Sequence, residues 1–240
     1  MQEYTYKINN DSPQEKKRFV RGLFDAIVPT YDLLNHVLSF GTDIVWRKNI
    51  FRHIQNVKGK AVVDLACGTG DLSLLLDRHG AAVASLDFSL AMLEKGVRKK
   101  AIRHFPVAGD AACLPFADNA FAVATIAFGI RNIPDINVFM GEAFRVLAPG
   151  GELVILELTR PANPLIRFGY TLYLTRLLPV IGGLLSGHRQ AYQYLARTIS
   201  TFISPENIRK MLLEHGFAST RLIPQCFGVA AIIIARKETP

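Results

Sequence analysis

The chain of 240 residues is 50% hydrophobic and 20% charged, which excludes an intrinsically disordered protein and suits one α/β domain with appendages better than two small domains. No two of the three cysteines (Cys67, Cys113 and Cys226) stand at a metal-ligand spacing, so we expect neither a metal site nor a disulfide framework. The formal net charge of +8 favours an anionic partner, but the densest basic run, residues 95–103, lacks interleaved aromatic residues. We interpret this run as a solvated helix face and expect no nucleic-acid partner.

Within the first 30 residues there is no apolar core followed by a small-residue cleavage site, so we expect no signal peptide. The cysteine count favours a reducing compartment, which predicts a cytoplasmic protein. The longest apolar stretch, from Pro164 to Leu185, is a poor transmembrane span because Arg167 and Arg176 interrupt it. A helix that covers a substrate or lies on a membrane fits better, and we expect transient contact with the membrane surface, on the inner face of the cell membrane.

Helical segments open the chain. Ser12-Pro13 followed by Glu15 is typical of a helix start, and Pro29 ends the helix that follows. Two more helices are expected over residues 33–40 and 43–54.

From residue 60 onward, strands and helices alternate, which predicts a parallel sheet covered on both faces. Strands are expected over residues 61–66, 81–87, 104–109, 121–128 and 152–157, helices over 72–78, 90–99 and 138–147, and a turn over 149–151. A helical insertion over 163–200, a helix from Ser204 to near Gly216, and a hairpin-like pair of strands over 222–223 and 229–235 follow.

The strongest local signal is the sequence Asp64-Leu-Ala-Cys-Gly-Thr-Gly70, on a strand-to-helix turn. Glycine at such a turn lets the backbone approach a ligand closely. Taken alone, Gly-x-Gly is weak, because many α/β turns use it only to pack a helix on a strand.

Acidic residues at the ends of the next two strands strengthen the case for a ligand. Asp87 ends the second strand, 17 residues after Gly70, where a carboxylate can accept both ribose hydroxyls of a nucleoside. Asp110 and Ala111 follow the third strand and place an acid and a backbone N–H where an adenine edge would lie. The pattern predicts an adenosine site at the carboxyl ends of the strands.

The same turn lacks the features of a dinucleotide site. Ser73 stands where the fingerprint Gly-x-Gly-x-x-Gly needs its third glycine, and Asp71 would repel a pyrophosphate. An adenosine cofactor without phosphates fits better, and S-adenosylmethionine is that ligand.

Residues 61–157 resemble the core of a class I methyltransferase, with Val-Val-Asp-Leu-Ala-Cys-Gly-Thr-Gly at 62–70 and Leu-Asp-Phe-Ser at 86–89 as its first two motifs. The resemblance implies a Rossmann-like, mostly parallel α/β sheet of seven strands with a reversed last strand. It also implies that Asp64 lies near the cofactor's amino-acid end, that Asp87 holds the ribose and that Asp110 holds the adenine. The methionine part of the cofactor would be lined by Gly68, Thr69 and Gly70.

Segments outside this core resemble the ubiquinone and menaquinone biosynthesis C-methyltransferases. They are residues 31–41 with Trp46-Arg47, Phe-Gly-Ile-Arg-Asn at 128–132, the helix after Asn163-Pro164, Ser186-Gly187 and residues 191–195. The resemblance covers nearly the whole chain. It implies methylation of a ring carbon in a reduced, prenylated quinone precursor, with demethylmenaquinol as the first candidate and a methoxylated benzoquinol of ubiquinone synthesis as the second.

Three positions depart from the pattern of that family. Ala127 replaces a serine that could contact the cofactor, His188 replaces an acidic or amide residue, and Cys226-Phe227 stands where a glycine pair often precedes the last strand. These changes leave the reaction class intact and leave the fine substrate preference open.

The chemistry requires a hydroquinone hydroxyl, with a phenol-like pKa of about 10, to lose its proton before a ring carbon attacks the methyl group. Arg131 is the catalytic candidate that stabilises the oxyanion, because it follows the fourth strand at its carboxyl end; a structural salt bridge is the alternative. His36 is a second candidate, with Tyr31 and Asn132, although a lone histidine on a helical segment is more often structural.

The helix expected over residues 165–178 has a narrow polar stripe opposite an apolar side. It could act as a lid that touches lipid and prenyl tail, lie buried in the fold, or form the interface of a homodimer. The stripe is Arg167, Thr171 and Thr175, and the opposite side is Ile166, Tyr170, Tyr173 and Leu177.

We therefore expect one domain in four parts: a helical cap (1–59), a cofactor-binding core (60–160), a helical substrate-side insertion (161–203), and a C-terminal helix with closing strands (204–240). Two other functions stay open. An RNA or protein methyltransferase is disfavoured because the sequence has no Asn-Pro-Pro-Tyr-like motif, no Pro-Cys nucleophile pair and no RNA-binding appendage. A non-catalytic cofactor-binding scaffold is the other.

Overall fold

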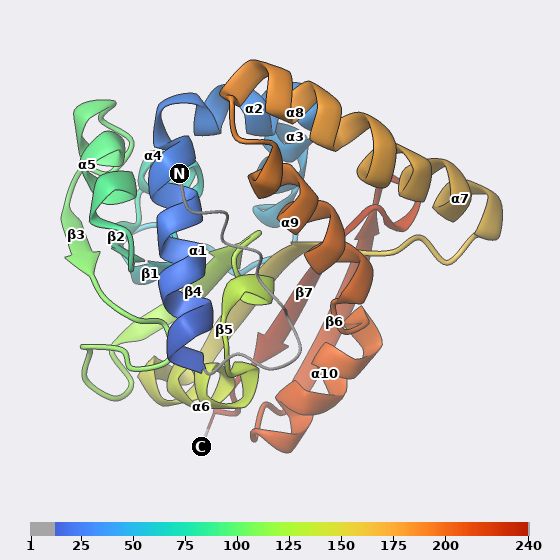
Figure 1. Ribbon diagram of the computed structural model, residues 1–240. Coiled ribbons are helices and arrows are strands. Elements are labelled where there is room, and N and C mark those ends of the chain that lie inside the picture. Colours follow the sequence, from blue (N-terminus) through green and yellow to red (C-terminus); the bar gives the residue numbers. More distant parts are fainter. Residues whose placement is uncertain (1–12, 240) are drawn as a thin grey trace.

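A computed structural model describes residues 13–239. Its centre is a seven-stranded sheet with the strand order β3-β2-β1-β4-β5-β7-β6 (Figure 1). The strands are β1 (Ala61–Leu65), β2 (Ala82–Asp87), β3 (Phe105–Ala108), β4 (Phe121–Ala127), β5 (Leu147–Leu158), β6 (Ser219–Gln225) and β7 (Ala230–Arg236). The first five pair in parallel, and β7 runs antiparallel to both β5 and β6. The predicted seven-stranded, mostly parallel sheet with a reversed last strand is confirmed.

Strand β5 begins at Leu147 rather than at Glu152, so the turn predicted over residues 149–151 is wrong as a strand boundary. The chain instead makes an irregularity inside the strand, where Gly150 has φ +73° and the β4–β5 register shifts between Phe121 and Val123. A glycine adopts this positive φ without strain, which lets the strand continue through it.

Helices cover both faces of the sheet, as a parallel sheet requires. The layers contain α3 (Thr42–Ile50), α4 (Asp71–Arg78), α6 (Ile136–Val146) and α10 (Pro205–Glu214), while α5 (Leu90–Arg98) packs against β2 and β3. Neighbouring strand residues point to opposite faces, so Val62 packs with α3 and α4 whereas Val63 packs with α6 and α10. The strand pattern therefore explains the two separate halves of the core.

Several helices begin at polar capping residues. Oγ of Ser204 accepts a hydrogen bond from the backbone N–H of Asn207 over 3.2 Å, and Pro205 occupies the first position of α10, as predicted. Helix α1 (Pro13–Ile27) ends before the short turn Val28–Thr30, which contains Pro29. The predicted capping residue Ser12 lies outside the described residues.

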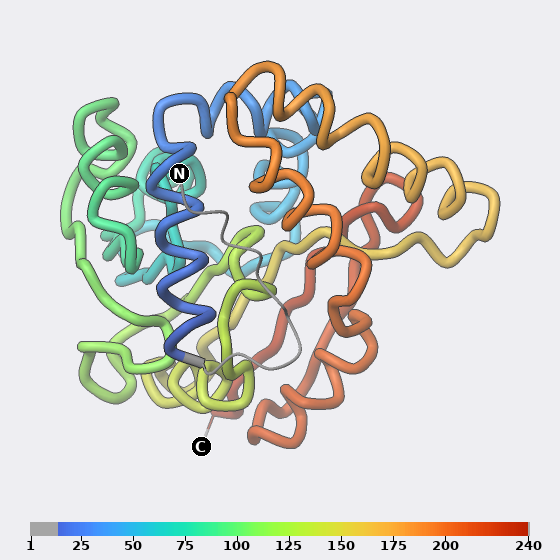
Figure 2. Tube along the Cα trace, in the orientation of Figure 1, coloured from blue at the N-terminus to red at the C-terminus, as the bar shows by residue number. Residues whose placement is uncertain are grey.

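A roof of helices covers the carboxyl ends of the strands (Figures 1 and 2). It consists of α1, α2 (Tyr31–Leu38), α7 (Pro164–Leu172), the π-helical turn Tyr173–Leu177, α8 (Leu178–Ser186) and α9 (Arg189–Thr201). These helices share a third hydrophobic cluster, which includes Leu34, Leu178 and Ile199. Oη of Tyr173 donates to the backbone oxygen of Leu38 over 2.6 Å and joins segments 135 residues apart.

The π-helical turn changes which side chains of the insertion face the protein. Tyr170 and Tyr173, from the expected apolar side, line the larger of two cavities, but Leu177 from the same side is 53% exposed and Leu174 lines the cavity instead. Among the described residues, one helix, Pro164–Ser186, is long and apolar enough to cross a membrane, with a mean hydropathy of 1.3. Because only 22% of its apolar window is buried, the alternative of a helix buried in the fold is wrong.

Candidate active site

The smaller of two adjoining cavities lies at the carboxyl ends of β1, β2 and β4. Its volume is about 140 Å³, and its wall includes four predicted cofactor residues, Gly68, Asp87, Asp110 and Ala111. Gly68 has φ +57°, and a Cβ added there would lie 3.6 Å from Cε1 of Tyr31. The turn therefore presents bare backbone to the cavity, which fits the close approach of an adenosine cofactor.

The carboxylate of Asp87 is held by backbone groups on two sides. Its Oδ2 accepts from the N–H of Gly68 over 2.8 Å, and its Oδ1 accepts from the N–H of Ser89 over 2.9 Å. Burial raises the pKa of Asp87, and these N–H donors work in the opposite direction. Each oxygen retains acceptor capacity, which suits the two hydroxyls of a ribose.

Helix α1 closes the smaller cavity over Asp110. Nζ of Lys17 forms an ion pair with Oδ2 of Asp110, whose Oδ1 accepts from the N–H of Ala112 over 2.9 Å. Val20 and Phe24, on the same helix, also line the cavity. The sequence does not predict this wall, because the amphipathic pattern of residues 13–27 shows that the helix packs against the protein but not against which part of the sheet.

Asp64 is not in the described wall of either cavity, although the resemblance places it near the cofactor. It is buried beneath α4, where Oδ2 accepts from Oγ of Ser73 and Oδ1 accepts from Oγ1 of Thr125, each over 2.7 Å. Burial raises its pKa to about 6. Asp64 therefore fixes β1 to α4 and β4, and acts on the cavity through the shape of the turn.

Thr69 and Gly70 are likewise absent from the described walls of the cavities. Oγ1 of Thr69 donates to Oδ1 of Asp32 over 2.5 Å, which anchors α2 to the glycine turn. Gly70 starts α4 with φ +84°, and a Cβ there would lie 2.5 Å from Cγ1 of Ile102. Both residues shape the turn that Gly68 presents to the cavity.

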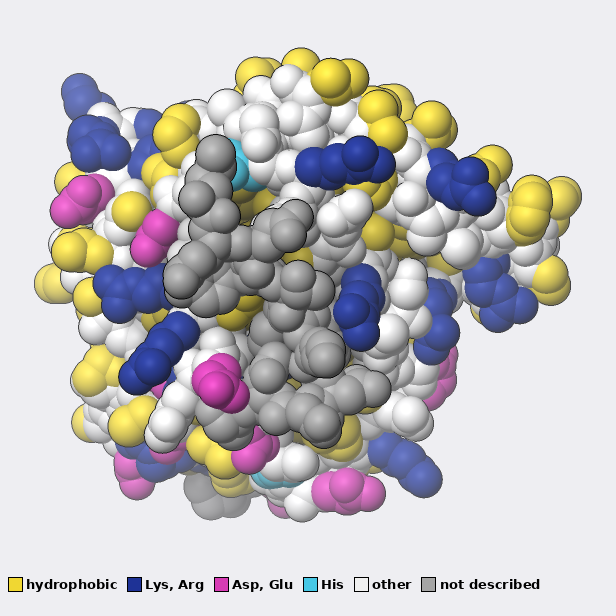
Figure 3. Space-filling view, in the orientation of Figure 1, with side chains coloured by type: hydrophobic (Ala, Val, Ile, Leu, Met, Phe, Trp, Pro, Cys, Tyr) yellow, Lys and Arg dark blue, Asp and Glu magenta, His cyan; other side chains and the backbone are white. Residues whose placement is uncertain are grey.

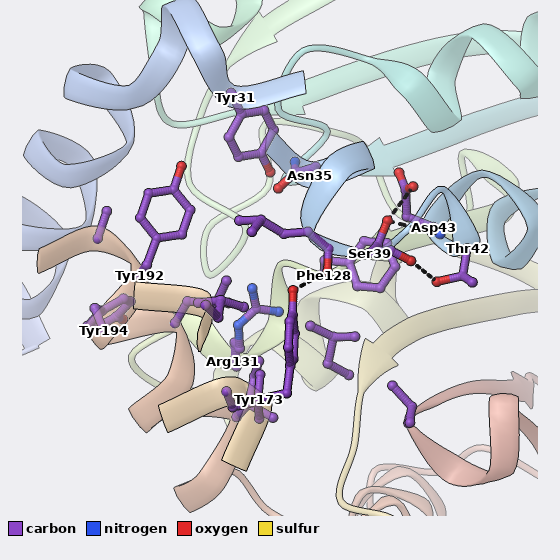
Figure 4. Close-up of a pocket in the computed structure, with 18 of the residues that line it drawn as sticks. Tyr31, Asn35, Ser39, Thr42, Asp43, Phe128, Arg131, Tyr173, Tyr192 and Tyr194 are labelled. Carbon is purple, nitrogen blue, oxygen red and sulfur yellow. Dashed lines mark hydrogen bonds between the residues drawn. The ribbon is translucent and has the colours of Figure 1, made fainter. Parts of the chain in front are cut away.

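A larger cavity of about 360 Å³ lies between the sheet edge and the roof (Figure 4). Aromatic and aliphatic side chains make up most of its wall. Phe24, Tyr31, Phe128 and Asn132 line both cavities, so the two spaces adjoin. Phe128 has φ +58°, a conformation that costs a non-glycine residue energy and is common at functional sites. Ligands in the two cavities would meet at this shared wall.

Tyr31 and Asn132, two of the second-rank candidates, stand at the shared wall. In Figure 4, Tyr31 lies across the cavity from Arg131. Burial raises the pKa of Tyr31, so its hydroxyl stays neutral near pH 7. Oη of Tyr194 donates to Oδ1 of Asn132 over 3.3 Å, which ties this wall to α9.

Arg131 lies in the short turn Ile130–Asn132 after β4, in the wall of the larger cavity. Its side chain is 7% exposed, and its Nη1 pairs with Oε1 of Glu157 near the end of β5. The ends of these parallel neighbours lie side by side, which brings the two residues together. Burial raises the pKa of Glu157. Arg131 thus forms the salt bridge that was the alternative to a catalytic role, and it also lies in the wall of the larger cavity.

His36 lies apart from Arg131 and is outside the described walls of both cavities. Its Nδ1 is 2.9 Å from Oδ2 of Asp43, which is itself in the wall and also pairs with Arg47. Burial alone would raise the pKa of Asp43, but the hydroxyl of Ser39 and the guanidinium of Arg47 outweigh it and lower that pKa. The structure therefore places the ring of His36 one contact away from the cavity wall, against Asp43.

The sequence profile of the ubiE/COQ5 methyltransferase family matches residues 11–237. The chain belongs to this family. A demethylmenaquinone methyltransferase from Thermus thermophilus is 44% identical over 215 residues, which cover 88% of this chain and 97% of the relative. A ubiquinone/menaquinone biosynthesis C-methyltransferase from Geobacter sulfurreducens is 41% identical over 233 residues, which cover 93% of this chain and 90% of the relative.

Solved structures of low sequence identity share the fold. A SAM-dependent methyltransferase from Thermotoga maritima, described as a possible histamine N-methyltransferase, superposes with a TM-score of 0.67 at 17% identity and covers 90% of this chain and 99% of its own. The [4+2]-cyclase SpnF superposes with a TM-score of 0.65 at 16% identity and covers 92% of this chain and 96% of its own. The fold alone therefore does not name the reaction. Family and fold together make this chain a methyltransferase that uses S-adenosylmethionine.

Proposed function

We propose that the protein methylates a ring carbon of a reduced, prenylated quinone precursor. The observation that carries the proposal is the shared wall of the two cavities: a small one beside Asp87 and Asp110 adjoins a large apolar one beside Arg131. A methyl donor and an apolar acceptor bound in them would meet at Tyr31 and Phe128. This arrangement supplies the alignment that methyl transfer requires.

The smaller cavity suits S-adenosylmethionine, which supplies a methyl group on a sulfonium sulfur. Asp87 would accept the ribose hydroxyls, and Asp110 with the backbone N–H of Ala111 would meet the adenine. Gly68 would leave room for the methionine part, because it carries no side chain. Asp64 would contribute by holding the turn from beneath.

Arg131 would stabilise the substrate oxyanion. A hydroquinone hydroxyl has a pKa of about 10, so it needs a nearby positive charge to ionise near neutral pH. A guanidinium remains charged throughout this range, which makes it a stabiliser of the oxyanion and excludes it as the base. The ionised oxygen would push electron density onto the adjacent ring carbon, which would attack the methyl group. The carbon–sulfur bond of the cofactor would break, its electron pair would stay on the sulfur, and the ring carbon would lose its proton to solvent, which restores the aromatic hydroquinone.

Demethylmenaquinol is the proposed first substrate. The names of the Thermus thermophilus and Geobacter sulfurreducens relatives support it, and the second name also supports a precursor of ubiquinone. The mostly apolar wall of the larger cavity favours a fused aromatic ring and the start of a prenyl tail.

Exposed apolar side chains on the insertion support contact with a membrane surface. Leu165, Phe168 and Leu184 are 80%, 71% and 82% exposed, and the upper edge of Figure 3 shows this apolar rim over α7 and α8. Phe40 is 80% exposed and also lines the larger cavity. We propose that a cytoplasmic enzyme touches the inner face of the membrane here, so that the prenylated substrate reaches the cavity beside Phe40. An interface of a homodimer would use the same residues.

The deciding experiment is a mass-spectrometric assay of purified protein with S-adenosylmethionine and chemically reduced demethylmenaquinol. A parallel reaction contains a demethylated, methoxylated benzoquinol. We expect a methylated product, and the ratio of the two products assigns the pathway. No product from either substrate, with folded protein that binds the cofactor, would contradict the proposal and favour a scaffold or, if RNA binds with a steep salt dependence, an RNA methyltransferase.

A further inference from the structure

Glu157 is a buried carboxylate that the proposed binding mode leaves without a role. Its side chain is 2% exposed, and Arg131, its partner, is 7% exposed. We propose that Glu157 is a positioning residue for Arg131: it fixes the guanidinium in the wall of the larger cavity, so that Arg131 meets the substrate oxygen in one orientation. This inference rests on the proposed function.

Stability alone is a poor explanation for the pair. A buried ion pair loses the hydration of both groups, and replacing it with apolar residues of similar volume is often neutral or stabilising. The pair is also incompletely satisfied, because Nε of Arg131 and Oε2 of Glu157 have no hydrogen-bond partner among the described residues. A salt bridge kept only for structure would be expected to satisfy these atoms.

Glu157 is itself rigidly placed. Its Oε1 accepts from the backbone N–H of Leu158 over 2.8 Å as well as from Nη1 of Arg131. Strand β5, which carries it, pairs with β4 on one side and with β7 on the other. Arg131, by contrast, lies on a short turn. Its ion pair with a residue of the central sheet therefore restricts the conformations of a long side chain in the cavity wall.

The protonation state of Glu157 decides whether it can hold Arg131. The groups that face it are the guanidinium and the backbone N–H of Arg131, the N–H of Leu158, and the phenol of Tyr170 from α7, which lies near enough to interact with both charges. Burial raises the pKa of Glu157, and protonation would remove the charge that holds the guanidinium. Turnover should therefore fall more steeply on the acid side in the wild type than in Glu157→Gln, in which only the ionisation of the substrate hydroxyl remains.

The test is a double-mutant cycle on the purified full chain with the quinol assay above. Glu157→Gln should lower kcat by about 100-fold, the loss typical of a reacting group misplaced by about 1 Å, without changing cofactor affinity. Combined with Arg131→Met, it should cause no further loss, because a residue that acts only through Arg131 has nothing left to position. Glu157→Asp should restore part of the activity.

Glu152→Gln is the matched control, because Glu152 is a buried acid (8% exposed) in the middle of β5, where it accepts from the N–H of Gln55 over 2.9 Å. It should keep wild-type turnover. If the wild type is active and Glu157→Gln has the same kcat, the inference is wrong. It is also wrong if Glu157→Gln lowers kcat by the same factor in the wild type and in Arg131→Met. An inactive wild type would instead refute the proposed function. If Glu157→Gln fails to fold, Glu157→Asp enters the same cycle with the same criteria.

Discussion

The backbone N–H of Gly68 donates to Oδ2 of Asp87 over 2.8 Å, so the turn after β1 and the end of β2 are fixed to each other. One carboxylate thereby shapes the glycine turn and faces the smaller cavity. Removing it should affect cofactor binding before it affects any chemical step.

Asp87→Ala should weaken S-adenosylmethionine binding at least tenfold, about 1.4 kcal/mol, because both ribose hydroxyls would lose their acceptor. Isothermal titration calorimetry measures this directly. Glu94→Ala, an exposed acid on α5 whose contact with Arg98 is 3.8 Å long, is the control and should bind as the wild type does. Equal affinity of Asp87→Ala and the wild type would remove Asp87 from the ribose site.

Arg131→Met should lower kcat by about 100- to 1000-fold, the range seen when one oxyanion donor is removed. Cofactor affinity should change little, because Arg131 is not in the described wall of the smaller cavity. Steady-state kinetics with cofactor titration separates the two effects. Full activity in this variant would exclude Arg131 from oxyanion stabilisation.

Asp64 predicts a pH dependence of stability. Burial raises its pKa from 3.8 to about 6, so the folded state binds a proton more tightly than the unfolded state does. This contribution is fully present below pH 3.8 and is lost as the pH rises through about 6. The whole window amounts to about 3 kcal/mol. Between about pH 4 and pH 7, the free energy of unfolding should therefore fall in the wild type relative to Asp64→Asn. Urea titrations at several pH values measure the difference, and parallel curves for the two proteins would contradict it.

A pair of glycine substitutions tests the shape of the turn. Gly70→Ala should destabilise the fold by about 2 kcal/mol or more, because Gly70 has φ +84° and the added Cβ would lie 2.5 Å from Ile102. Gly141→Ala, in the middle of α6 with no atom within 4 Å of an added Cβ, should stabilise it by about 0.5 to 1 kcal/mol. Chemical denaturation compares them, and a neutral Gly70→Ala would mean that the turn tolerates a side chain.

The apolar rim makes a separate prediction about lipid. The double variant Phe168→Asp and Leu184→Asp should bind anionic vesicles at least tenfold more weakly, because each side chain contributes about 1.5 to 3 kcal/mol when buried. Phe105→Asp, which alters a residue 62% exposed on β3, should bind like the wild type. Vesicle flotation measures binding. An unchanged double variant would contradict membrane contact, and loss of a dimer in light scattering would assign the rim to an interface between copies.

Most of the sheet could be predicted because its signals are local. The buried apolar runs mark the strands, and the glycine turn at residues 64–70 marks where β1 ends. Asp87 and Asp110 could also be placed, since the carboxyl ends of parallel strands meet at one edge. His36 could not, because nothing local shows that its ring turns to Asp43 instead of the cavity.

Other parts depend on contacts that no short pattern records. In the sequence, Glu157 is only the last acidic residue of a predicted strand. Its contact with Arg131 follows from the pairing of β4 with β5, which the sequence does not show. Lys17 reaches Asp110 across 93 residues of sequence. The π-helical turn has no sequence signal in a run of leucines and tyrosines, so the exposure of Leu177 could not be predicted from helical spacing.

The roof unites segments that precede β1 with segments that lie between β5 and β6, and the hydrogen bond from Tyr173 to Leu38 spans 135 residues. Neither segment can bury its apolar side chains without the other, because they share one hydrophobic cluster. The two should therefore open and close as one cooperative unit. A quinol that fills the cavity beneath would slow amide hydrogen exchange in α2 and α8 together, although these helices lie far apart in the sequence.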